Sequence, residues 1–137
     1  MSTEQTAPSY GPTNPSPAEA AASPVRRFGS VVGLDPDKEA YYRELHAAVW
    51  PQVLERLQRS NIRNYSIYVA ELGGKRYLFS YFEYIGCDFE ADSRAIAEDP
   101  ETQRWWKECE PCQIRLPSSK PGVQWSDLEM VFFASLA

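Results

Sequence analysis

The pattern of hydrophobic and polar positions predicts alternating strands and helices. Residues 25–34 have strand composition and end before Asp35-Pro36, a pair that caps and opens a helix. Apolar or aromatic residues then recur at positions 42, 45, 49, 53 and 57, which is helical spacing. Pro51 removes one backbone N–H donor and crowds the preceding turn, so we expect a kink there and a helix end near Arg59.

The second half of the chain predicts a hairpin, further helical segments and a closing strand. Two aromatic-rich strands, 62–72 and 75–84, flank Gly73-Gly74, which is typical of a hairpin turn. We expect a second helix from Asp88 and a short helical turn after Asp99-Pro100. A loop over 109–124 and a strand within 125–136 complete the pattern.

The resulting order, β-α-β-β-α-β, is the split βαβ or ferredoxin-like pattern and predicts an α+β fold with an antiparallel sheet. Helices cover only one face of such a sheet. The chain has four Trp, eight Tyr and six Phe, many of them on the predicted strands. We therefore expect the uncovered face to pack against a partner subunit, sheet to sheet, in a homodimer.

Composition divides the chain into a tail and one domain. Residues 1–24 hold five of the eleven prolines and almost no large apolar side chains. Such a segment cannot bury enough surface to offset the entropy of ordering it, so we expect a disordered N-terminal tail and a folded domain over 25–137. The tail resembles neither a secretory signal nor an Arg-rich transit peptide.

The net charge limits the classes of binding partner, and the cysteine content indicates the cellular compartment. The net charge is −5 without a basic stripe, which argues against nucleic acid and anionic membranes as partners. No apolar run approaches the eighteen residues of a membrane span. The three cysteines, Cys87, Cys109 and Cys112, are an odd number, and free thiols in a cytoplasmic protein are the simplest interpretation.

The C-x-x-C pair at Cys109 and Cys112 has two known uses. One is zinc, but the second half of a four-ligand site is missing, and only Cys87 and His46 are left as candidates. The other is thiol redox chemistry, which requires a different placement relative to strand and helix. We therefore interpret both cysteines as ordinary loop thiols and expect no metal.

The only histidine, His46, forms a Tyr42-x-x-x-His46 element. Side chains at i and i+4 lie on one helix face, and imidazole exchanges protons near neutral pH. The pair suits proton transfer at a sugar hydroxyl or carbonyl. From spacing alone, a buried histidine bonded to the tyrosine is the alternative.

Three further aromatic residues are candidate ligand contacts. Tyr65 lies on a predicted strand and could bind a ligand hydroxyl, or fill the core or an interface instead. Trp105 and Trp106 are adjacent, so both cannot face the same core from a short helix. An indole offers a flat apolar face for the C–H side of a sugar and an N–H donor. One tryptophan in the core and one at an interface is the alternative.

Taken in order, YYRELHAAVWPQVLERL, NYSIYVAE, RYLFSYFEY, QRWWK and LEMVFF resemble the L-rhamnose mutarotase family from about Arg27 to Phe133. The resemblance implies a ferredoxin-like fold, a dimeric α/β barrel, and interconversion of the α and β anomers of L-rhamnose or a related 6-deoxy sugar. It implies no metal or organic cofactor. It assigns the catalytic proton donor to His46 and substrate binding to Tyr42, Tyr65, Trp105 and Trp106.

Several features differ from this pattern or remain open. Ala47-Ala48 follow the histidine, the tail is extra, and the stretch 109–123 is unfamiliar and could reshape the pocket. The base is unassigned: Tyr42, a water molecule or a carboxylate such as Glu83 could serve. Two other functions are compatible with the fold, a non-catalytic sugar-binding module and a cofactor-free dimeric monooxygenase.

Overall fold

A computed structural model of the chain describes residues 6–136, and the predicted tail residues 1–5 lie outside this range. The α-helices are α1 (Pro17–Ala22), α2 (Glu39–Ala47), α3 (Pro51–Arg59), α4 (Phe89–Glu98) and α5 (Pro100–Cys109). The strands are β1 (Arg26–Leu34), β2 (Ile62–Leu72), β3 (Lys75–Tyr84), β4 (Gln113–Ile114) and β5 (Ser126–Asp127). Two short 3₁₀ turns, Pro36–Lys38 and Glu110–Cys112, precede α2 and β4.

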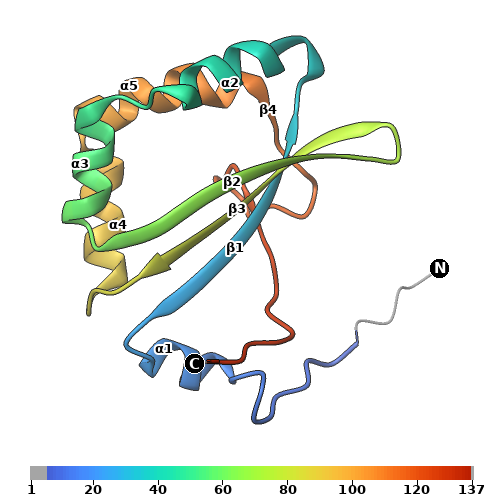
Figure 1. Ribbon diagram of the computed structural model, residues 1–137, viewed down its shortest axis with the longest axis vertical. Coiled ribbons are helices and arrows are strands. Elements are labelled where there is room, and N and C mark those ends of the chain that lie inside the picture. The colour runs from blue at the N-terminus through green and yellow to red at the C-terminus, as the bar shows by residue number, and fades with distance from the viewer. Residues whose placement is uncertain (1–5, 137) are drawn as a thin grey trace.

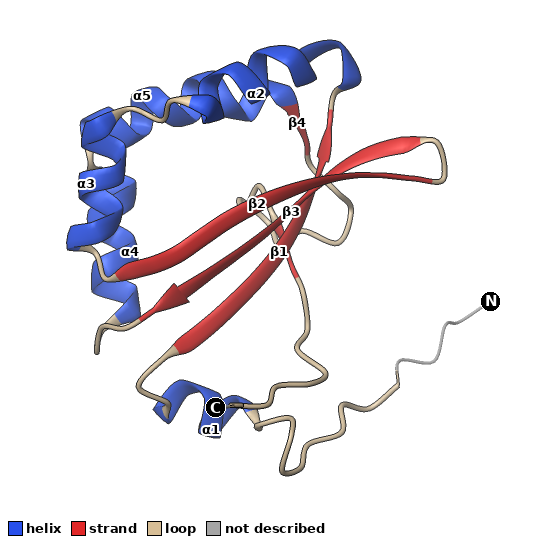
Figure 2. Ribbon diagram, in the orientation of Figure 1, coloured by secondary structure: helices blue, strands red, loops and turns tan. Residues whose placement is uncertain are grey.

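The sheet is antiparallel, with the strand order β2-β3-β1-β4 and with β5 also paired to β1. Figure 1 shows the sheet curving away from helices α2 to α5, which all lie on one side of it. The secondary-structure colours in Figure 2 make this two-layer arrangement plain. The predicted α+β class, the antiparallel sheet and the β2–β3 hairpin are confirmed.

The helix predicted to kink at Pro51 is in fact two helices. Helix α2 ends at Ala47, and Ala48 leaves the helical region with φ −146° and ψ 73°. Trp50 is extended, with φ −58° and ψ 132°, as expected for a residue before proline, and Pro51 starts α3 as its first residue. A break replaces the predicted kink because both Ala48 and Trp50 leave helical conformation.

Aspartates cap the 3₁₀ turn before α2 and the starts of α4 and α5, as predicted. The Asp35 carboxylate accepts from the Asp37 N–H at 3.0 Å, and Asp88 accepts from Ala91 at 3.1 Å. Asp99 accepts from the N–H of Thr102 at 2.9 Å and precedes Pro100. Helix α5 is longer than the short turn expected there, because its buried face packs on α3 and α4.

Part of the segment predicted to be a disordered tail is ordered. Ser16 and Glu19 form a capping box for α1, with each side chain bonded to the backbone of the other. The Phe133 N–H donates to the Thr13 carbonyl at 2.7 Å, which ties this segment to the C-terminal end of the chain. A helix therefore lies within the segment predicted to be a disordered tail, because the capping box satisfies the backbone donors at its start.

The predicted closing strand is also wrong over most of its length. Only Ser126 and Asp127 pair with β1, and residues 128–136 have no regular secondary structure. Val131 and Phe132 are 79% and 66% exposed. The alternation of apolar residues fitted a strand, but the segment pairs with β1 only at Ser126 and Asp127. The Leu128 N–H adds one bond to the Gly29 carbonyl at 2.9 Å, and the chain then leaves the sheet.

The core lies between the sheet and the helices. Its buried residues come from β1, β3, α2, α3, α5 and the turn after α5; they are Val32, Leu34, Tyr42, Val53, Leu78, Trp105, Cys109 and Cys112. This core reaches the site, because Tyr42 and Trp105 belong to it and both contact His46.

Candidate active site

A cavity of about 700 Å³ lies between the sheet and the helices. Four of the five residues predicted from sequence line it: His46, Tyr65, Trp105 and Trp106. They come from α2, β2 and α5, so elements far apart in sequence form one site. A cavity of this size is within the range of small-molecule sites.

The rest of the lining is mostly apolar, and sequence reasoning missed it. These residues are Val49, Val53, Leu54, Leu57, Ile62, Ile67, Phe82, Phe89, Ile96 and Val123, together with Ser93 and Thr102. Among residues 6–136, no Asp, Glu, Lys or Arg side chain lines the cavity. Helical spacing had marked Val49, Val53 and Leu57 as apolar positions of one helix face, but nothing local separates a cavity wall from a filled core.

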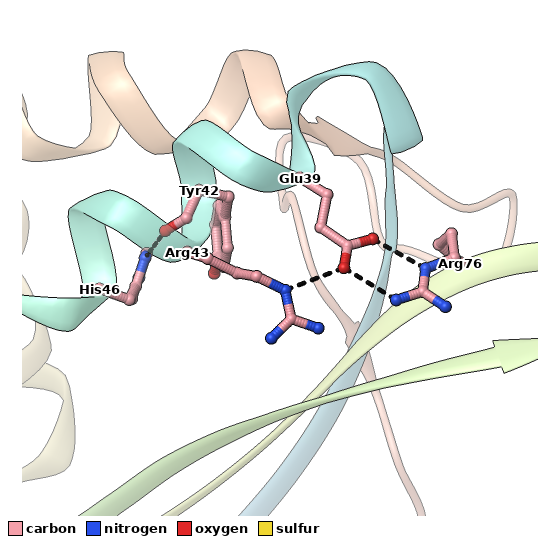
Figure 3. A network of polar contacts seen from close by, with 5 residues as sticks. All are labelled: Glu39, Tyr42, Arg43, His46 and Arg76. Carbon is pink, nitrogen blue, oxygen red and sulfur yellow. Dashed lines mark hydrogen bonds and ion pairs between the residues drawn. The ribbon is translucent and has the colours of Figure 1, made fainter.

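The His46 ring is held on two sides by aromatic rings. It stacks on the Tyr42 ring, with the two ring centroids 4.1 Å apart. It also packs against Trp105 in a T-shaped arrangement, with ring centroids 5.1 Å apart. Its Nδ1 lies 2.9 Å from the Tyr42 carbonyl oxygen. Figure 3 marks this contact with a dashed line. A carbonyl only accepts, so Nδ1 carries the proton and Nε2 is the nitrogen available to a ligand. Burial lowers the pKa of His46, and the bond to Tyr42 partly opposes this.

Tyr42 is a core residue rather than part of the main cavity wall. It is 4% exposed, and burial raises the pKa of its hydroxyl. It lines a smaller cavity of about 250 Å³ that also reaches His46. The structure therefore brings Tyr42 against the histidine ring, while its substrate-binding role stays a prediction.

A β-bulge turns Tyr65 toward the cavity. Asn64 and Tyr65 together oppose the single residue Phe82, and Asn64 adopts a left-handed φ of 51°. Tyr65 is 45% exposed and lines the cavity. Burial raises the pKa of its hydroxyl, with a smaller effect from Cys109. The hydroxyl therefore stays protonated and can donate a hydrogen bond.

The two tryptophans have different surroundings, although both line the cavity. Trp105 is 6% exposed and contacts the rings of His46 and Trp50, each at 5.1 Å. Trp106 is 37% exposed and presents free indole surface. Trp105 thus supports the histidine, and Trp106 is the better platform for a ligand.

A charge network anchors the first turn of α2, the helix that carries His46. Glu39 accepts two hydrogen bonds from Arg76 on β3, both at 2.8 Å, and one from Arg43 at 2.9 Å. Figure 3 shows this network beside the Tyr42–His46 contact. These bonds lower the pKa of Glu39 to about 2. The carboxylate is ionised and fixes α2 against the sheet.

Glu83, one of the carboxylates considered as a base, is not at the cavity. It alternates with Phe82 along β3, so it projects from the opposite face of the sheet. Its oxygens accept from Asn64 and from Tyr81, at 2.8 and 2.7 Å, and these bonds lower its pKa.

The C-x-x-C thiols are packed in the core. Cys109 and Cys112 are 4% and 1% exposed and unpaired, whereas Cys87 is exposed. Burial raises the pKa of Cys109 to about 12, the opposite of what a reactive thiolate requires. Within residues 6–136, no three His, Cys, Asp or Glu side chains form a group that could hold a metal ion.

Fold and site together define a small α+β protein with one histidine at an aromatic, uncharged ligand cavity. The family model for L-rhamnose mutarotase matches residues 27–134, and the chain belongs to that family. An L-rhamnose mutarotase from Listeria monocytogenes is 30% identical, covering 80% of this chain and 98% of its own length. One from Opitutus terrae is 33% identical, covering 77% and 95%.

A solved structure shares the fold. The crystal structure of an L-rhamnose mutarotase from Formosa agariphila superposes with a TM-score of 0.59 at 21% identity, covering 80% of this chain and 99% of its own. Within the described part of the chain, no helix is both long and apolar enough to cross a membrane.

Proposed function

We propose that this protein is an isomerase that interconverts the α and β anomers of L-rhamnose or a related 6-deoxy sugar. The observation that carries the proposal is the environment of His46. Its ring is fixed between Tyr42 and Trp105, its Nδ1 is bonded to a carbonyl, and it lines a ligand cavity. The family membership and the named relatives support the same activity.

The reaction opens a cyclic hemiacetal and closes it again. A proton reaches the ring oxygen while another leaves the anomeric hydroxyl, the bond between the ring oxygen and C1 breaks, and an aldehyde forms. Rotation about the C1–C2 bond followed by closure gives the other anomer, and both protons return. In our proposal the imidazolium form of His46, protonated on both nitrogens, donates its Nε2 proton to the ring oxygen, which contributes on the order of 10²–10⁴-fold to the rate.

The base is a water molecule in this proposal. Tyr42 keeps its proton at neutral pH because burial raises its pKa, and Glu83 projects from the other face of the sheet. Tyr65 would bind a sugar hydroxyl, Trp106 would stack on the C–H face of the ring, and Tyr42 and Trp105 would complete the site around His46.

We also propose that the protein works as a cytoplasmic homodimer with the ferredoxin-like, dimeric α/β barrel arrangement. The sheet face away from the helices supports this. Tyr68 on that face is 63% exposed and lies opposite Phe79 in the β2–β3 pairing. Sedimentation should give a dimer, and a monomer at micromolar concentration would contradict this assembly.

Saturation-difference NMR of anomer exchange tests the function. The unmodified protein should exchange L-rhamnose anomers rapidly, and His46→Asn should lose on the order of 10²-fold or more of that rate while still binding the sugar. The exchange rate should fall as pH rises through an apparent pKa below 6.5, because burial lowers the pKa of His46. Binding without exchange by the unmodified protein would favour a sugar-binding module instead.

A further inference from the structure

The chain leaves the sheet between β4 and β5 for the eleven residues 115–125. Ile114 pairs with Gly33 and Ser126 pairs with Val31, so Val32 is the one residue of β1 opposite this excursion. The segment is therefore an insertion into an edge of the sheet. Because both ends are fixed on the same strand, the loop has little freedom to move as a whole.

Arg115 holds the loop from within. Its Nε donates to the Val123 carbonyl at 3.0 Å, and its Nη2 donates to the carbonyls of Ser119 and Lys120 at 2.9 and 2.6 Å. Gly122 supplies the positive φ of 75° that the turn before Val123 requires. A planar guanidinium with several donors suits three carbonyls at once. Val123 is thereby set in one position.

Val123 presents free aliphatic surface to the cavity that His46 lines. It is 43% exposed. Among the aliphatic residues of the cavity wall, only Leu54 on α3, at 51%, is also exposed rather than packed into the protein. The Trp105 ring already packs against the rings of His46 and Trp50. Free apolar contact for a ligand therefore falls chiefly to the rings of Tyr65 and Trp106 and to the aliphatic side chains of Leu54 and Val123.

We propose that Val123 determines specificity by contacting the C5 methyl group of a 6-deoxy sugar, and that Arg115 is its positioning residue. This inference rests on the proposed mutarotase function. The methyl group is the one apolar substituent of such a sugar. Against an aliphatic wall, a hydroxymethyl group would lose hydrogen bonds to water without a replacement. A difference of this kind, between a methyl and a hydroxymethyl group at an apolar wall, changes kcat/KM by about 10–200-fold.

Val123→Thr tests the contact, because threonine keeps the branched shape and adds a hydroxyl. The measurement is kcat/KM for anomer exchange of L-rhamnose and of L-mannose, which carries a hydroxymethyl group in place of the methyl. The variant should shift the ratio toward L-mannose on the order of 10-fold. Val131→Thr, the same change at a position 79% exposed and outside the cavity lining, should leave the ratio unchanged.

Arg115→Lys tests the positioning role, since lysine cannot reproduce the three-carbonyl contact. It should raise KM for L-rhamnose and move the sugar ratio toward one, while the pH dependence set by His46 stays the same. An unchanged ratio in Val123→Thr with normal exchange would overturn this inference alone, as would a shift seen in Leu54→Thr instead. No exchange of any sugar by the unmodified protein would overturn the proposed function and this inference with it.

Discussion

Removing the charge of Glu39 should destabilise the protein in a pH-dependent way. Its carboxylate is only 16% exposed, and Arg76, 27% exposed, binds it through two donors. Arg43 adds a third donor from the same helix, but is 60% exposed. The perturbation is Glu39→Gln, which keeps the size of the side chain and removes its charge.

The expected magnitude follows from the lowered pKa. These bonds move the pKa of Glu39 from its ordinary 4.5 to about 2. At about 1.4 kcal/mol per pKa unit this corresponds to about 3 kcal/mol as an upper limit. Solvent screening at the exposed Arg43 reduces it, so we expect a loss of about 1–2 kcal/mol at pH 7. A carboxylate with a depressed folded-state pKa stabilises fully above pH 4.5 and loses this contribution as pH falls toward 2.

Urea unfolding followed by tryptophan fluorescence measures the effect at pH 7 and at steps down to pH 2. The difference between the unmodified protein and Glu39→Gln should be largest at pH 7 and should shrink below pH 4.5. Glu55→Gln is the matched control, because Glu55 and Arg59 form a helix-surface pair at 3.7 Å with both side chains 65% exposed. Its effect should stay below about 0.5 kcal/mol. Equal effects of the two substitutions, or a Glu39→Gln difference independent of pH, would refute the reasoning.

Three further predictions concern the cavity, the core and the tail. Tyr65→Phe should raise KM for the sugar several-fold with little change in kcat, and Tyr68→Phe should not; equal kinetics would remove Tyr65 from ligand binding. Cys109→Ser should lower the free energy of unfolding by about 1–3 kcal/mol because it buries a hydroxyl, whereas Cys87→Ser should stay within about 0.5 kcal/mol. Similar unfolding curves for both would contradict the packing of the first thiol. Deleting residues 1–24 should lower the melting temperature but retain anomer exchange, since no residue of the described part of this segment, 6–24, lines the cavity; loss of exchange would be inconsistent with this.

Only part of the site could be predicted from the sequence. The i, i+4 spacing places Tyr42 and His46 on one helix face, and the structure has their rings stacked. The adjacent tryptophans were expected to differ in environment, and Trp105 is more buried than Trp106. The aliphatic wall was missed, because Val123 reaches the cavity only through a loop whose conformation depends on Arg115.

The sequence by itself determined the order of the long strands and of most helices, though not α1 or β4, because these elements start and end at residues a few positions apart. Aspartate caps, a proline at the first helical position and a Gly-Gly turn act locally, and each occurs as predicted. The capping box that orders α1 is equally local and could have been predicted.

The tertiary structure decided what depends on residues distant in sequence. Glu39 and Arg76 are 37 positions apart, and only folding shows that they bind each other. Asn64 forms a bulge because β2 pairs with β3, and that bulge turns Tyr65 to the cavity. The closing strand pairs with β1 only at Ser126 and Asp127, and further along the chain Phe133 bonds to Thr13 instead. Local propensity therefore fixed the elements, while pairing and packing between distant segments fixed the site.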